Sequence, residues 1–174
     1  MELALLGLRL IVGLGFAAHG AQKLFGSFGG HGLEGTAGFF EQVGLRPAGL
    51  HARAAGTAEF AGGLLIAVGL LTPFAAAALI AVMTAAVLTV HIKNGFFNDD
   101  QGYEYNLTLV AALFALAAIG SGEWSLDHAL GTELAGTGWA LGALGVGLLG
   151  GLGAVLGGRF AGHAQAGSGH PGTA

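Results

Sequence analysis

Long apolar runs are the feature that most constrains how this chain can fold. Five mostly apolar stretches follow one another, at residues 3–25, 54–72, 74–92, 104–120 and 134–158. An α-helix needs about 20 apolar residues to cross roughly 30 Å of hydrocarbon. Only 9% of the residues are charged, whereas a soluble domain carries about 25%. The sequence therefore predicts a multi-pass integral protein of the cell membrane, in contact with the lipid bilayer.

Composition also excludes several classes of function. The chain has no Cys, so disulfides, Cys-ligated zinc and Cys-held iron–sulfur clusters are excluded within it. Its six Lys and Arg residues are not clustered, and the net charge is −4. A protein of this kind lacks the basic patch that holds phosphates, so no nucleic-acid partner is expected.

The breaks between the apolar runs predict the topology. Leu71-Thr72-Pro73 separates the second run from the third. Because Pro cannot continue a helix and the turn is so short, these two helices should be antiparallel neighbours. The fold class predicted for residues 1–130 is all-α, an integral membrane antiparallel four-helix bundle. The first run could instead be a cleaved signal peptide, but it lacks a basic start, and a retained helix is favoured.

The C-terminal part of the chain is rich in glycine. Residues 131–158 are predicted to add a fifth, Gly-rich transmembrane helix, and residues 159–174 a disordered tail. The alternative for the fifth helix is a low-complexity tail. Small residues four apart let helices approach closely in lipid, so a homo-oligomer through this helix is an expectation. The pairs at this spacing are Gly138/Gly142, Gly147/Gly151 and Gly153/Gly157.

The connectors carry two further predicted elements. A short amphipathic helix is predicted at residues 36–45, with Thr36 as its N-cap. Because it carries Phe39 and Phe40 between two spans, it should lie at the membrane interface or cap the bundle. After the fourth span, residues 123–133 should also lie at the interface.

Polar residues concentrate on one side of the predicted bundle. Antiparallel helices bring together the end of the first, the start of the second, the end of the third and the start of the fourth. We call the candidate site on this side the polar mouth. Its candidate catalytic residues are His19, Lys23, Glu59, His91 and Glu104, and its candidate binding residues are Phe39, Phe40, Asn94, Phe96 and Tyr105.

Charges inside the predicted spans need partners. A buried carboxylate is costly unless it is paired, so Glu59 should meet Lys23, His19 or His91. The alternative to a functional role is a polar lock that only holds the bundle together, and charged residues near helix ends can equally be ordinary boundary residues. Arg9 stands alone near the other end of the first run and should extend to the opposite membrane surface.

The chemistry of these side chains indicates the kind of ligand. Two His and one carboxylate can hold iron, zinc or copper, but no compact ligand motif is present, and no metal site is predicted. A quinone suits a lipid-accessible pocket with His, Tyr and Phe better, and imidazole exchanges protons near neutral pH. The sequence has no evident redox centre, so electrons would come from a soluble redox enzyme partner or a small reductant.

Several short motifs occur one after another, at residues 8–10, 19–26, 35–40, 58–63, 69–72, 91–97, 104–105 and 125–127. Their order is typical of the DoxX family of small bacterial and archaeal membrane proteins, which this chain resembles. The resemblance covers about residues 4–130 and implies a four-helix membrane bundle. It links the chain to DoxD, the membrane subunit of an archaeal thiosulfate:quinone oxidoreductase, and to membrane redox complexes in oxidative or sulfur stress. The Gly-rich segment after residue 133 is not part of the pattern.

Three functions remain open at this point. The first is a quinone-linked subunit of a membrane redox complex, in which His19 or His91 carries protons, Glu59 sets their charge and Lys23 stabilises an anion. The second is a non-enzymatic membrane scaffold that anchors soluble redox enzymes. A small-solute transporter is weaker, because neither an inverted repeat nor a pair of broken helices is evident. The sequence does not decide whether the chain is itself an enzyme. Most basic residues fall on the side of the polar mouth, which places that side in the cytoplasm.

Overall fold

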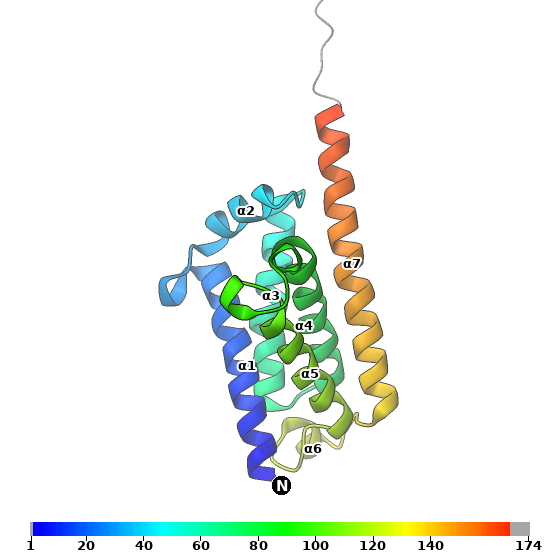
Figure 1. Ribbon diagram of the computed structural model, residues 1–174. Coiled ribbons are helices and arrows are strands. Elements are labelled where there is room, and N and C mark those ends of the chain that lie inside the picture. Colours follow the sequence, from blue (N-terminus) through cyan, green and yellow to red (C-terminus); the bar gives the residue numbers. More distant parts are fainter. Residues whose placement is uncertain (1, 168–174) are drawn as a thin grey trace, which may run out of the picture.

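The computed structural model describes residues 2–167, and every regular element in that range is helical (Figure 1). Helix α4 continues into a π-helical turn at Val87–His91. Short 3₁₀ turns lie at Ser27–Gly29, Ile92–Asn94 and Asn98–Asp100. The α-helices are α1 Glu2–Phe25, α2 Gly32–Gln42, α3 Ala48–Val68, α4 Thr72–Ala86, α5 Glu104–Ile119, α6 Leu126–Leu130 and α7 Thr137–Gly167.

The helices form a bundle with two distinct ends (Figure 1). Helix α1 runs from the N-terminus to the end where α2 lies across the bundle, which we call the head. Helix α3 returns to the opposite end, which we call the foot, and α4 and α5 run up and down again. Helix α6 lies at the foot, and α7 then rises beside α4 and projects past the head (Figure 1). Helix α1 packs mainly on α3, while α4 packs on α7, α3 and α5.

Within the part of the chain that the structure describes, three helical segments are long and apolar enough to cross a membrane, namely Glu2–Phe25, Thr72–Asn94 and Thr137–Gly162. Helix α5 is apolar but shorter. Helix α3 begins six residues before the predicted second span, carries three ionisable residues and packs between α1 and α4. The prediction of an all-α membrane bundle is confirmed.

The apolar core lies where α4 meets α3, α5 and α7. Its large side chains with no exposed surface are Ile66, Leu79, Ile80, Leu113 and Leu116. Burying such a side chain contributes roughly 1.5–3 kcal/mol when the alternative is water. Inside lipid, close packing between helices takes over as the main source of association. The fit of the helices to one another therefore matters more here than total apolar area.

Glycines set the close approach of α1 and α3. A Cβ added to Gly13 would lie 2.5 Å from the backbone N of Ala67, and one added to Gly63 would lie 2.5 Å from the backbone N of Ala17. Contacts this short do not occur between real side chains and backbone, so the two helices can only approach in this way without side chains at these positions.

Helix α7 packs on α4 through one of the three predicted glycine pairs. A Cβ added to Gly147 would lie 2.6 Å from the Cβ of Ile80, and one added to Gly151 would lie 2.5 Å from the carbonyl O of Ala81. This pair therefore forms a helix contact within the chain. A Cβ added to any member of the other two pairs would meet nothing within 4 Å; these residues are Gly138, Gly142, Gly153 and Gly157.

The bounds of two elements differ from those predicted. Helix α2 begins at Gly32, and the hydroxyl of Thr36 donates to the carbonyl O of Gly32 at 2.7 Å, so Thr36 lies inside the helix and is not its N-cap. Helix α7 continues to Gly167, nine residues past residue 158, where the fifth helix was predicted to end and the disordered tail to follow. The helix continues because no Pro interrupts it. Residues 168–174 of the predicted tail lie outside the described residues.

Replacing Gly151 with leucine is expected to disturb the packing of α7 on α4. The Cβ would lie 2.5 Å from the carbonyl O of Ala81 and 2.6 Å from the Cβ of Thr84, and such overpacking costs about 1–3 kcal/mol. Gly153→Leu is the matched control, because its Cβ would meet nothing within 4 Å. Unfolding in detergent, followed by circular dichroism, should show a lower midpoint for Gly151→Leu alone. Equal midpoints would contradict the packing described.

Candidate functional site

A pocket of about 460 Å³ lies near the head, between α3, α4 and α7. Its walls are mostly Ala, Gly and Val, so the pocket is largely apolar. Helix α2 contributes two aromatic rings, and α1, α3 and the π-helical turn contribute ionisable groups. The polar and aromatic residues that define its chemistry are Lys23, Phe39, Phe40, His51, Glu59 and His91.

An ion pair between Lys23 and Glu59 lies in the wall of this pocket. The side chain of Glu59 is 3% exposed and that of Lys23 is 27% exposed. A carboxylate buried to this degree requires a partner of opposite charge or hydrogen-bond donors. Of the three partners predicted for Glu59, Lys23 is the one that forms the ion pair. The close approach of α1 and α3 brings the two residues together.

His91 reaches the pocket from the π-helical turn at the end of α4. Its Nδ1 lies 2.7 Å from the carbonyl O of Gln101. A carbonyl oxygen can only accept a hydrogen bond, so Nδ1 carries the proton and donates. Nε2 of the neutral ring is then an acceptor. Interruptions of this kind in α-helices often occur at functional sites, and this one places an oriented imidazole at the pocket.

His51 is a pocket residue that the sequence prediction missed. It lies in the first turns of α3 and lines the same pocket as Glu59. Its position, eight residues before Glu59, is a signal that could have found it, since residues at this spacing lie on the same side of a helix. The predicted boundary at residue 54 left it in a connector instead.

The structure brings together half of the ten predicted site residues. Lys23, Glu59, His91, Phe39 and Phe40 all line the pocket. The other five do not.

Those five residues have other surroundings. His19 is exposed. The Oε2 of Glu104 accepts from the backbone N of Asn98 at 3.0 Å, and the side chain of Asn94 donates to the carbonyl O of Gln101 at 3.3 Å. These contacts shape the loop between α4 and α5. The rings of Phe96 and Tyr103 pack edge to face, and Tyr105 is 55% exposed.

A second group of buried polar residues lies at the foot, and it corrects the prediction for Arg9. This side chain does not extend to the membrane surface, since the residue is only 1% exposed. Its guanidinium donates to the carbonyl O of Ser121 and, at 2.6 Å, to that of Trp124. Carbonyls of the α5–α6 loop accept from two of its nitrogens, and the carboxylates of Glu2 and Asp127 interact electrostatically with it, so the charge does not need to reach water.

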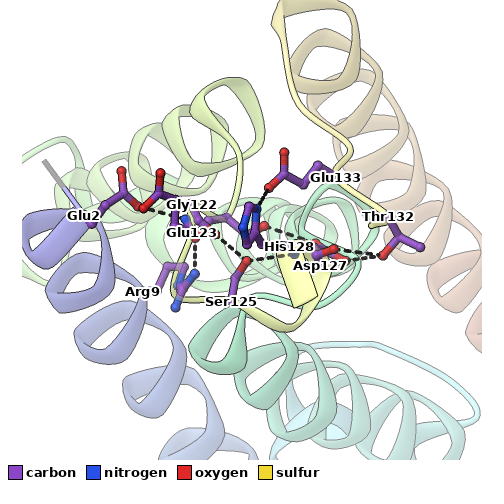
Figure 2. A network of polar contacts seen from close by, with 10 residues as sticks. Glu2, Arg9, Gly122, Glu123, Ser125, Asp127, His128, Thr132 and Glu133 are labelled. Atoms are coloured by element: carbon purple, nitrogen blue, oxygen red, sulfur yellow. Dashed lines mark hydrogen bonds and ion pairs between the residues drawn. The ribbon is translucent and has the colours of Figure 1, made fainter. Parts of the chain in front are cut away.

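Asp127 is the centre of the same group and has no exposed surface. Its carboxylate accepts from the backbone N of Leu71 at 2.9 Å, from the backbone N and hydroxyl of Thr72 at 3.4 Å, and from the hydroxyl of Ser121 at 3.4 Å. Thr132 donates to it at 3.3 Å (Figure 2). The prediction that residues 123–133 all lie at the interface is therefore wrong for Asp127, which joins α6 to the α3–α4 turn.

Among residues 2–162, no three His, Cys, Asp or Glu side chains are grouped so that they could hold a metal ion. The ionisable groups of the pocket are one ion pair and two imidazoles. What they offer a ligand is hydrogen bonding, charge and proton exchange, beside an apolar wall.

Fold and pocket together define a helical membrane protein with a paired charge and oriented imidazole at one end of its bundle. Residues 4–92 match the sequence profile of the DoxX family, and the chain belongs to this family. The matched range contains Lys23, Glu59 and His91.

Two relatives support this assignment. The "Uncharacterized membrane protein Rv3486" of Mycobacterium tuberculosis is 30% identical over 133 residues, which cover 71% of this chain and 78% of the relative. The "Putative oxidoreductase CatD" of Bacillus subtilis is 32% identical over 126 residues, which cover 72% of this chain and 86% of the relative. No solved structure matches.

Proposed function

We propose that this chain binds a quinone in the pocket near the head and serves as the membrane subunit of a redox complex. The observation that carries the proposal is the combination of the Lys23–Glu59 ion pair and the oriented His91 in the wall of one apolar pocket. The name of the Bacillus subtilis relative, which describes an oxidoreductase, supports a redox role.

The pocket residues suit the head group of a quinone. The head group is a flat, apolar ring with carbonyl oxygens at opposite edges. Phe39 and Phe40 offer aromatic surface to the ring. Lys23 can donate to a carbonyl oxygen and stabilise negative charge on it, since a positioned cation acts strongly where water is excluded. Glu59 holds the ammonium group in place.

Reduction of a quinone to a quinol takes up two electrons and two protons. We assign the electrons to a soluble redox enzyme or a small reductant. The protons are assigned to His91 and His51, because imidazole gains and loses protons near neutral pH. His91 holds its ring with Nδ1 on a carbonyl, so Nε2 is the atom that exchanges the proton.

Binding of a naphthoquinone without a side chain tests the proposal. The partition of the labelled compound is measured between empty phospholipid nanodiscs and nanodiscs that hold the protein. His91→Ala should weaken binding roughly tenfold, because Nε2, once protonated, donates a hydrogen bond to a quinone oxygen and the variant loses it. The exposed His19 gives the control His19→Ala, which should bind as the wild type does.

Two results would refute the quinone site. One is a wild-type protein that takes up no more naphthoquinone than empty nanodiscs. The other is equal binding by His91→Ala and His19→Ala. If a soluble redox enzyme still bound to the protein in either case, the scaffold function would replace the one proposed here.

A further inference from the structure

The pocket has two chemically different sides. Its paired charges come from α1 and α3, whereas its walls on α4 and α7 are almost entirely Ala, Gly and Val. The wall formed by α4 and the π-helical turn extends from Ala78 to Val90, a separation of twelve residues and thus about 18 Å along the helix axis. The apolar side is therefore long as well as smooth.

The volume exceeds what a ring needs. A cavity of about 150 Å³ already holds a benzene ring, and the pocket measures about 460 Å³. A ring placed beside Lys23 and His91 would leave most of the apolar wall without a ligand in contact. An unbranched or branched hydrocarbon chain is the kind of group that fits the remaining space.

Gly150 is a glycine that helix packing does not explain. Its neighbour Gly151 must lack a side chain, because a Cβ would lie 2.6 Å from the Cβ of Thr84. A Cβ on Gly150 would meet only the Cβ of Ala81, at an ordinary 3.6 Å. Gly150 nevertheless lines the pocket, as does Ala154 one turn further on. What the missing side chain preserves here is open space in the pocket.

Helix α7 is also fixed to the head beyond this wall. The carbonyl O of Gly158 accepts from the backbone N of Arg46 at 3.1 Å, and Arg159 donates to the carbonyl O of Leu88 at 3.3 Å. A Cβ on Gly158 would lie 2.9 Å from Nε2 of His51. The wall formed by α7 is thus held at a set distance from α3 and α4.

We propose that α7 selects the hydrocarbon chain of the ligand, with Gly150 and Ala154 keeping open a groove for the isoprenoid chain of a prenylated quinone. This inference rests on the proposed quinone site and adds a role for a helix that lies outside the residues matched by the family profile. The head group contacts Lys23 and His91, and the chain lies along α4 and α7.

The test compares two probes in the nanodisc assay, the naphthoquinone without a chain and the same naphthoquinone with four isoprene units. Each uptake is referred to empty nanodiscs, so that partition into lipid cancels. Wild-type protein should prefer the chain-bearing probe by about tenfold or more, because the chain gains close contacts with the groove walls that fluid lipid does not provide. Gly150→Leu should remove most of that preference, and leave binding of the chainless probe within about twofold.

Gly153→Leu is the control on the same helix, since Gly153 does not line the pocket and a Cβ there meets nothing within 4 Å. It should keep the preference of the wild type, and Ala154→Leu should lose it as Gly150→Leu does. If wild type binds both probes equally, or if Gly150→Leu and Gly153→Leu behave alike, the chain groove is refuted while the head-group site stands. If neither probe binds, the proposed function itself has failed.

Discussion

Lys23→Met is expected to lower the free energy of unfolding by about 3 kcal/mol, because it leaves a buried carboxylate without its partner. The side chain of Glu59 is 3% exposed, so the unpaired charge has almost no access to solvent. The side chain of Lys23 is 27% exposed, so water already weakens the ion pair. The expected loss therefore lies at the lower end of the roughly 3–5 kcal/mol that breaking a buried ion pair costs. Equilibrium unfolding in mixed detergent micelles measures the change.

Two further variants separate the ion pair from other effects. Lys23→Met combined with Glu59→Leu should recover most of the lost stability, since an apolar pair of similar size can replace a buried ion pair at little cost. The ion pair between Arg46 and Glu41, 41% and 54% exposed, gives the control Glu41→Gln, which should cost less than about 1 kcal/mol. If Lys23→Met were as mild as Glu41→Gln, the pair would not be buried as described.

The same pair shows how much of the site could be predicted from sequence. The Pro73 turn made two helices antiparallel, and the cost of an unpaired carboxylate required a partner for Glu59 on the same side of the bundle. Those two arguments were sufficient to place Lys23, Glu59 and His91 together. They depend only on the direction of helices and on which end of each helix carries a polar residue.

Rotation of a helix about its axis was harder to predict. His19 lies one turn from Lys23, yet it is exposed, because the face of α1 that packs on α3 is set by Gly13 and Gly20. Nothing in the apolar pattern of α1 distinguishes these glycines from those at positions where no neighbour approaches, such as Gly15. Contacts between helices, which the sequence does not display, decide which polar residues face the pocket.

The foot could not be predicted for a different reason. Arg9 and Trp124 are 115 residues apart in the chain, and the α5–α6 loop offers Arg9 hydrogen-bond acceptors from its backbone. Its partners are backbone carbonyls, and every sequence offers these everywhere. An isolated charge in an apolar run therefore indicated only that some partner exists, inside the protein or at the membrane surface.

Asp127→Ala is expected to lower the free energy of unfolding by about 4 kcal/mol. The carboxylate accepts from two backbone N–H groups and three hydroxyls, and buried donors left without an acceptor cost about 1–3 kcal/mol each. Hydroxyls can turn to other acceptors, but the amides of Leu71 and Thr72 cannot. The loss should therefore appear as loosening of the α3–α4 turn, measured by hydrogen exchange at those two amides.

Asp127→Asn separates charge from shape in this network. Its amide keeps one acceptor oxygen but turns an NH₂ group toward donors, so it should recover less than half of the loss in Asp127→Ala. Glu133→Gln is the control, because the pair between His128 and Glu133 is about half exposed on both sides and should contribute less than about 1 kcal/mol. Faster exchange at Leu71 and Thr72 in the Asp127 variants, with none in Glu133→Gln, would establish that this carboxylate fixes the turn on which the antiparallel pair of α3 and α4 depends. Unchanged exchange in Asp127→Ala would mean that Pro73 and the helix packing suffice to hold the turn.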